Sequence, residues 1–134
     1  MKGSGLSVTL IKCKTNIATS KVKIKEFIKS IVERVDMKPL GETIIEKGAG
    51  HLPGLSAVQL IETSHIALHT FTINNTYMFS IESCKEFDVC SLIDYLLEYF
   101  LPEEHKLVCY PIDTVVNVEV EDEKEGWFKR GSGR

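Results

Sequence analysis

The strongest constraint on this chain's fold is a series of short runs in which apolar and polar residues alternate. Residues 55–62, 65–71 and 76–84 each repeat with a period of two, which is typical of a β-strand with one buried face. Ile73-Asn74-Asn75 separates the last two runs and is typical of a hairpin turn. The middle of the chain therefore predicts antiparallel strands with one apolar face and one polar face.

Two other segments show the helical repeat of three and four residues. One follows Ser20, a typical N-cap, and ends before Pro39; the other follows the N-cap Asp88 and ends before Pro102. Further strands are predicted at residues 6–11, 43–45 and 106–118. The resulting order, β-α-β-β-β-β-α-β, predicts an α+β fold: a two-layer sandwich of a mainly antiparallel sheet with two helices on one face. The other face of the sheet must then be covered in another way or be unusually polar.

The length of 134 residues predicts a single domain over residues 1–134, with a core at about 6–118. Residues 119–134 are predicted to form an acidic tail that ends in a linker-like Gly-Ser-Gly-Arg. We interpret Gly3-Ser4-Gly5 as a linker remnant for the same compositional reason. Outside these segments the composition is that of an ordinary globular protein.

Charge and hydropathy exclude several classes of partner. A formal net charge of −3 argues against a nucleic-acid-binding surface, which needs a basic excess. Because the sequence has neither an apolar run of membrane-spanning length nor a signal peptide, we expect a cytoplasmic protein without a membrane partner. The four cysteines form no Cys-x-x-Cys pair, so neither zinc nor a disulfide framework is expected, and each is predicted to be a small buried residue: Cys13, Cys84, Cys90 and Cys109.

The polar face of the central strands carries reactive side chains. His65 and His69 lie four residues apart, which on a strand separates them by about 13 Å, so no shared metal ion is expected. If Ile66 and Leu68 face the helices, both histidines face the opposite way. A serine, histidines and a thiol that converge on one face are suited to proton transfer and nucleophilic chemistry. That face is also predicted to carry Phe71 and, from the next strand, Met78, Ser80, Glu82 and Cys84.

The stretch GLSAVQLIETSHIALHTF followed by YMFSIESC resembles the core of the small prokaryotic S-adenosylmethionine decarboxylases. The shared elements are Gly-x-Ser, then Ser-His-x-x-x-His-Thr, then a strand that ends in a cysteine. The resemblance covers roughly residues 6–112. It implies the fold of that family and a homodimer in which two sheets face each other, which would cover the polar face.

The resemblance also implies a chemistry. The hydroxyl of Ser64 would attack the carbonyl of Thr63, and the chain would cleave itself there to leave a pyruvoyl cofactor derived from Ser64. His69, as proton acceptor, and Ser56 would assist this cleavage. The pyruvoyl carbonyl would take up the substrate amine as a Schiff base and accept the electrons of decarboxylation, after which Cys84 would return a proton to the substrate.

The substrate is less constrained than the reaction. The family usually has a glutamate where Thr63 stands, an adenine-stacking aromatic residue where Gly50 stands, and a ribose-binding glutamate where Ile73 stands. We therefore keep three hypotheses: decarboxylation of S-adenosylmethionine for polyamine synthesis, decarboxylation of arginine or ornithine, and an unprocessed homologue that acts as a binding partner. The residues assigned to the amino-acid substrate are Phe71, His65 and Glu82.

Overall fold

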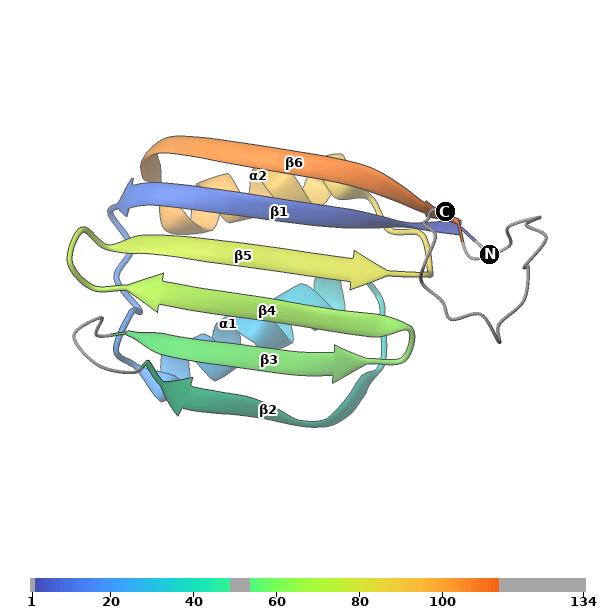
Figure 1. Ribbon diagram of the computed structural model, residues 1–134, viewed down its shortest axis with the longest axis horizontal. Coiled ribbons are helices and arrows are strands. Elements are labelled where there is room, and N and C mark those ends of the chain that lie inside the picture. The colour runs from blue at the N-terminus through green and yellow to red at the C-terminus, as the bar shows by residue number, and fades with distance from the viewer. Residues whose placement is uncertain (1, 49–53, 114–134) are drawn as a thin grey trace, which may run out of the picture.

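The computed structural model describes residues 2–48 and 54–113, and they form two layers: one antiparallel sheet and two helices on the same face of it (Figure 1). The sheet has six strands in the order β2-β3-β4-β5-β1-β6. This confirms the predicted fold class and element order. The elements are β1 (Lys2–Cys13), α1 (Lys21–Arg34), β2 (Pro39–Lys47), β3 (Leu55–Ile61), β4 (Ser64–Phe71), β5 (Thr76–Ser83), α2 (Val89–Phe100) and β6 (Pro102–Asp113).

Both helices begin at the predicted caps. The hydroxyl of Ser20 accepts the backbone N–H of Lys23 at 3.1 Å, and the carboxylate of Asp88 accepts that of Ser91 at 3.0 Å. Each helix packs an apolar stripe onto the sheet, where aromatic rings fill the space between the layers; Phe27 of α1 lies 5.1 Å from Phe100 of α2 between ring centroids. The core therefore lies on one side of the sheet only.

Strand alternation sorts side chains between that core and the opposite side, which we call the outer face. Ile66 and Leu68 of β4 are fully buried under the helices, as predicted. His69 and Met78 lie on the outer face and are exposed. Within the described residues, no helix or loop covers the outer face (Figure 1).

The interpretation of Gly3-Ser4-Gly5 as a linker remnant is wrong. These residues belong to β1; all three pair with β6, and Ser4 and Gly5 also pair with β5. A Cβ atom at Gly3 would overlap the backbone carbonyl of Ser83, and one at Gly5 would overlap the ring of Tyr110. The glycines are therefore required by close approach of neighbouring strands.

Both edge strands begin earlier than predicted, and β2 is also longer than predicted. β2 starts at Pro39, which an edge strand tolerates, and its register shifts between Leu40 and Ile44, with Gly41 at a φ of 77°. β6 starts at Pro102, four residues before its predicted beginning. Its predicted continuation to residue 118 and the acidic tail 119–134 lie outside the described residues.

The cysteines differ in burial. Cys13 is buried, and burial raises the pKa of its thiol to about 11. Cys90 and Cys109 are exposed, so the prediction that every cysteine is buried is wrong for them. Cys109 lies on the edge strand β6, where nearly every side chain is exposed. Within residues 2–48 and 54–113, no helix has the length and apolar character needed to cross a membrane.

Candidate functional site

The Thr63–Ser64 peptide bond lies in the tight turn between β3 and β4. β3 ends at Ile61, and Ser64 begins β4. Both Thr63 and Ser64 are partly exposed. Ser64 pairs with Ser83 of β5, and its hydroxyl oxygen lies 3.4 Å from Nδ1 of His65. The predicted cleavage site is therefore at one end of the sheet, where the backbone is accessible.

Cys84 follows directly after β5 at the same end of the sheet. It lines an open hollow of about 690 Å³ together with Thr63. The hollow is polar and charged, since Lys85 and Glu62 lie on its wall with Nζ and Oε1 4.0 Å apart. Its remaining lining residues are Lys2 and Glu86. Cys84 and Thr63, whose carbonyl Ser64 is predicted to attack, thus line the same open hollow.

A second reactive pair lies toward the other end of the sheet. The hydroxyl oxygen of Ser56 and Nδ1 of His69 are 2.8 Å apart, and the two residues are register partners in β3 and β4. His69 lies five positions after Ser64, which is about 16 Å along a strand and places the two side chains on opposite faces. The predicted convergence on one place does not occur: Ser64 and Cys84 lie at one end of the sheet, and Ser56 and His69 form a hydrogen-bonded pair toward the other end.

The residues assigned to substrate binding divide in the same way. Phe71 is partly buried at the His69 end of β4, next to the turn that carries Ile73, which is 81% exposed. His65 and Glu82 are register partners beside Ser64. Gly50, where the family usually has an adenine-stacking aromatic residue, lies outside the described residues.

Tyr110 of β6 joins the Ser64 end of the site and was not predicted. Its ring lies over Gly5 of β1, and its hydroxyl donates a hydrogen bond to the carboxylate of Glu82. The hydrogen bond to Glu82, and to a smaller extent desolvation of the phenol, raise the pKa of Tyr110. Finding this contact from sequence would require the register of β6, β1 and β5. Across the outer face the residues in this row are Leu60, His65, Glu82, Gly5 and Tyr110.

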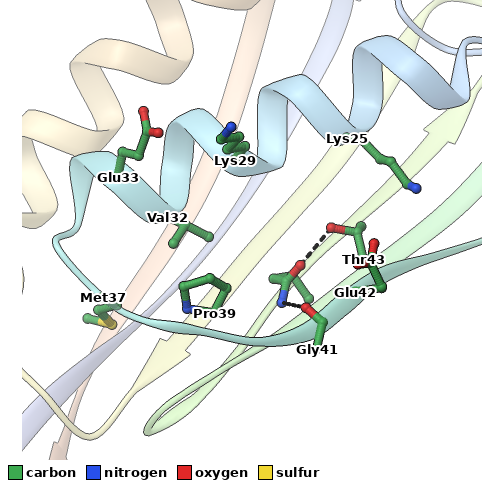
Figure 2. Close-up of a pocket in the computed structure, with 10 residues that line it drawn as sticks. Lys25, Lys29, Val32, Glu33, Met37, Pro39, Gly41, Glu42 and Thr43 are labelled. Atoms are coloured by element: carbon green, nitrogen blue, oxygen red, sulfur yellow. Dashed lines mark hydrogen bonds between the residues drawn. The ribbon is translucent and has the colours of Figure 1, made fainter.

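A separate cavity of about 390 Å³ lies between α1 and β2, on the helix side of the sheet (Figure 2). Gln59 is 4% exposed there; it accepts a hydrogen bond from the Thr43 hydroxyl at 2.6 Å and donates one to the Gly41 carbonyl at 3.1 Å. The Gln59 side chain therefore bonds to β2 in the segment where the pairing of β2 with β3 becomes irregular. Met37 lies at one end of the cavity, and its sulfur accepts a hydrogen bond from Ser83 at 3.3 Å.

No group of three or more potential ligands for a metal ion occurs in the part of the chain that the structure describes. His65 and His69 both lie on the outer face, but they are four strand residues apart. The chemistry available at the Ser64 end is therefore that of a hydroxyl, an imidazole, a thiol and a carboxylate.

Comparison with known proteins assigns the chain to a protein family. A search of curated proteins finds no match. Among solved structures, the chain is similar to the adenosylmethionine decarboxylase from Aquifex aeolicus VF5, with 16% identity, a TM-score of 0.69, and coverage of 89% of this chain and 96% of that one; this likeness concerns the fold. The family described as S-adenosylmethionine decarboxylase matches residues 5–110, a range that includes both reactive pairs. The chain therefore belongs to the S-adenosylmethionine decarboxylase family.

Proposed function

We propose that this chain is the proenzyme of a pyruvoyl-dependent decarboxylase and that it cleaves itself between Thr63 and Ser64. The observation that carries the proposal is the position of this peptide bond, partly exposed in a tight turn and bordering the hollow that Cys84 lines. A serine on a turn can rotate its hydroxyl toward the preceding carbonyl without leaving the sheet. Membership of the decarboxylase family supports the same conclusion.

Self-cleavage needs only the chain and water. Oγ of Ser64 bonds to the carbonyl carbon of Thr63, the C–N bond to Ser64 breaks, and the amide becomes an ester. Loss of the Ser64 α-proton and cleavage of its Cβ–Oγ bond then release residues 1–63 as a carboxylate. Water hydrolyses the remaining enamine to a ketone and ammonia, which leaves a pyruvoyl group at the start of the second chain.

The residues around Ser64 fit such a group. A pyruvoyl group supplies an electron-accepting carbonyl for the decarboxylation of an amino acid. Cys84, which lines the same hollow as Thr63, would return a proton to the substrate carbon. Glu82 accepts a hydrogen bond from a neutral phenol and forms no ion pair in the described part of the chain, so its carboxylate is available to a cationic substrate.

S-adenosylmethionine is the substrate that the family supports, and the product would serve as an aminopropyl donor in polyamine synthesis. Its sulfonium group is the cation that Glu82 would attract. Arginine and ornithine also carry a positive charge, on side chains that are smaller because they lack the adenosyl group. They are the second candidates. Ile73 favours testing them, because an exposed aliphatic side chain cannot hydrogen-bond to a ribose.

A homodimer would bring the Ser56–His69 pair of one copy close to the Ser64 end of the sheet in the other copy. The middle row of the outer face carries no charge and runs in register across all six strands. Two copies stacked face to face about a two-fold axis along this row would place the Ser56–His69 pair of one copy over the His65–Glu82 row of the other. His69 of the partner subunit would then accept the Ser64 proton once the Ser64 hydroxyl turns toward the outer face, where Nδ1 of His65 already lies 3.4 Å from it. The middle row consists of Ile44, Val58, Ala67, Ser80, Ser7 and Val108.

Intact-mass analysis of the purified chain tests the proposal. The expected products are a fragment that ends at Thr63 and a fragment that starts with a pyruvoyl group, whereas the Ser64→Ala variant stays intact. Carbon dioxide release is then measured with S-adenosylmethionine, arginine and ornithine. A wild-type chain that stays at 15.1 kDa after long incubation would overturn the proposal and favour an unprocessed binding partner.

A further inference from the structure

We propose that Ser83 is a positioning residue for self-cleavage: its buried hydroxyl holds the side chain of Thr63 and so fixes the carbonyl that Ser64 attacks. This inference rests on the proposed self-cleavage. Ser83 itself makes and breaks no bond in that reaction. Ser83 is the last residue of β5, and its side chain is 0% exposed.

The Ser83 oxygen is the centre of a compact hydrogen-bond cluster. It lies 2.9 Å from Oγ1 of Thr63 and 2.9 Å from both the backbone N and the backbone O of Lys85. The sulfur of Met37 lies 3.3 Å away on the remaining side. All of these partners come from different parts of the chain: the turn between β3 and β4, the segment after β5, and the segment between α1 and β2.

Counting donors and acceptors assigns a direction to the Thr63 bond. A serine hydroxyl has one proton to donate and two lone pairs that accept. The N–H of Lys85 fills one lone pair, and the Ser83 proton is directed to the Lys85 carbonyl or to Met37. The second lone pair receives the proton of the Thr63 hydroxyl. A buried hydroxyl that loses this donor leaves a lone pair unsatisfied, so the cluster favours a single position for Thr63.

This bond acts on the residue that supplies the electrophilic carbonyl. Thr63 is β-branched, so its χ1 has few allowed values, and the bond to Ser83 selects one of them. The backbone of the next residue, Ser64, pairs with Ser83 itself. Ser83 therefore holds the scissile peptide on both sides, through the Thr63 side chain and through the β4–β5 pairing.

Orientation of this kind affects the attack of Ser64 more than it affects the fold. The hydroxyl of Ser64 must approach the Thr63 carbonyl along a narrow path, and a misplacement of about 1 Å can slow a reaction by about 100-fold. The methyl group of Thr63 is bonded to the same carbon as its hydroxyl. The rotamer that the bond selects therefore decides whether that methyl group obstructs the path.

Two substitutions at Thr63 separate the hydroxyl from the shape of the side chain. Thr63→Val keeps the branched shape and removes the donor, whereas Thr63→Ser keeps the donor and removes the methyl group. We expect Thr63→Val and Ser83→Ala each to slow self-cleavage by about tenfold, and Thr63→Ser to cleave at the wild-type rate or faster. The double variant Thr63→Val/Ser83→Ala should be no slower than the slower of the two single variants, because both remove the bond between Thr63 and Ser83.

The full-length chains are synthesised in a cell-free system, and fragment formation is followed by intact mass. Hydroxylamine added during the time course captures the ester as a hydroxamate at Thr63. The defect of Thr63→Val should appear as less captured ester, because the attack itself is slowed. Thermal unfolding of the same chains in the non-cleaving Ser64→Ala background should show Thr63→Val and Thr63→Ser within a few degrees of each other.

The outcomes separate the two proposals. If the wild type forms no fragments, the proposed function fails and the role of Ser83 fails with it. If the wild type cleaves and Thr63→Val cleaves as fast as Thr63→Ser, only the role of Ser83 is overturned. Accumulation of ester in Thr63→Val, or additive slowing in the double variant, would also overturn that role, since either result places the defect elsewhere.

Discussion

The side a strand residue faces decides what it can react with. His69 lies five positions after Ser64 in β4, an odd offset, so their side chains leave the sheet in opposite directions. His65 is the imidazole that a single chain offers to Ser64, at 3.4 Å. The histidine that the family resemblance assigns to proton transfer lies about 16 Å from Ser64 along its own strand, so in the proposed homodimer it would act on Ser64 of the other copy.

The four thiols should differ in reactivity according to burial. At pH 8, an alkylating reagent should modify the exposed Cys90 and Cys109 and spare Cys13 until the chain unfolds, because burial raises the pKa of Cys13 to about 11. Peptide mass mapping with and without urea measures this. Rapid alkylation of Cys13 in the folded chain would contradict the burial of that residue.

The same thiol makes a pH-dependent contribution to stability. In the unfolded chain Cys13 ionises near its ordinary pKa of 9.0, whereas in the folded chain it stays protonated up to about pH 11. The free energy of unfolding should therefore decrease as pH rises from 9 to 11, and Cys13→Ala should reduce this decrease. Urea titrations of both proteins at pH 8 and pH 10 provide the comparison.

At the scale of the elements, the two glycines of β1 set how closely its neighbours approach. Gly3→Ala should lower the free energy of unfolding by about 1–3 kcal/mol, because the added methyl group meets the backbone carbonyl of Ser83, which cannot move away without separating β1 from β5. Gly5→Ala should cost less, since it meets the Tyr110 ring, which can rotate. Urea denaturation measures both, and equal costs would contradict this difference.

The amount of the fold that the sequence predicts depends on how each strand is covered. β3, β4 and β5 have one buried face, so the alternation of Ile66 and Leu68 with the histidines gave their positions and their faces. β6 is an edge strand with almost every residue exposed, and the start of β1 consists of small residues. Neither produces a periodic apolar signal, so the predicted starts of both strands are four residues too late.

The sequence predicts which residues form the candidate site better than it predicts how those residues are arranged in space. The family resemblance supplied Ser64, His69 and Cys84, and strand parity alone would have placed the first two on opposite faces. Tyr110 and Ser83 could not be predicted in the same way. Their contacts depend on the register of strands that are distant in sequence, and short polar residues in a strand carry no periodic signal of their own.

At the scale of the whole molecule, the outer face is expected to join two copies. Val58→Asp places a charge in the middle row, so it should yield a monomer by sedimentation and greatly slow self-cleavage. The matched control is Val22→Asp, which adds the same charge at a side chain that is 67% exposed on α1. A monomeric Val58→Asp chain that cleaves at the wild-type rate would exclude a site shared between copies.

Mixed dimers test the sharing directly. Ser64→Ala and His69→Ala chains should each stay intact alone. Coexpressed in equal amounts with different tags, they should form mixed dimers in which only the His69→Ala chain is cut, at up to about half of its copies for random pairing. Intact mass identifies which tagged chain is cut. Cleavage of His69→Ala alone at the normal rate would show that His69 is dispensable.

The separation of Ser64 from His69 along β4 has a consequence for how the protein matures. If two molecules must meet before the first covalent step, as proposed, maturation of dilute protein should follow second-order kinetics, with a half-time that shortens as synthesis proceeds. A newly made molecule in a cell with few copies would wait as an inert precursor. Abundance would then act as the trigger that commits the population to an active form, irreversibly and without a separate activator.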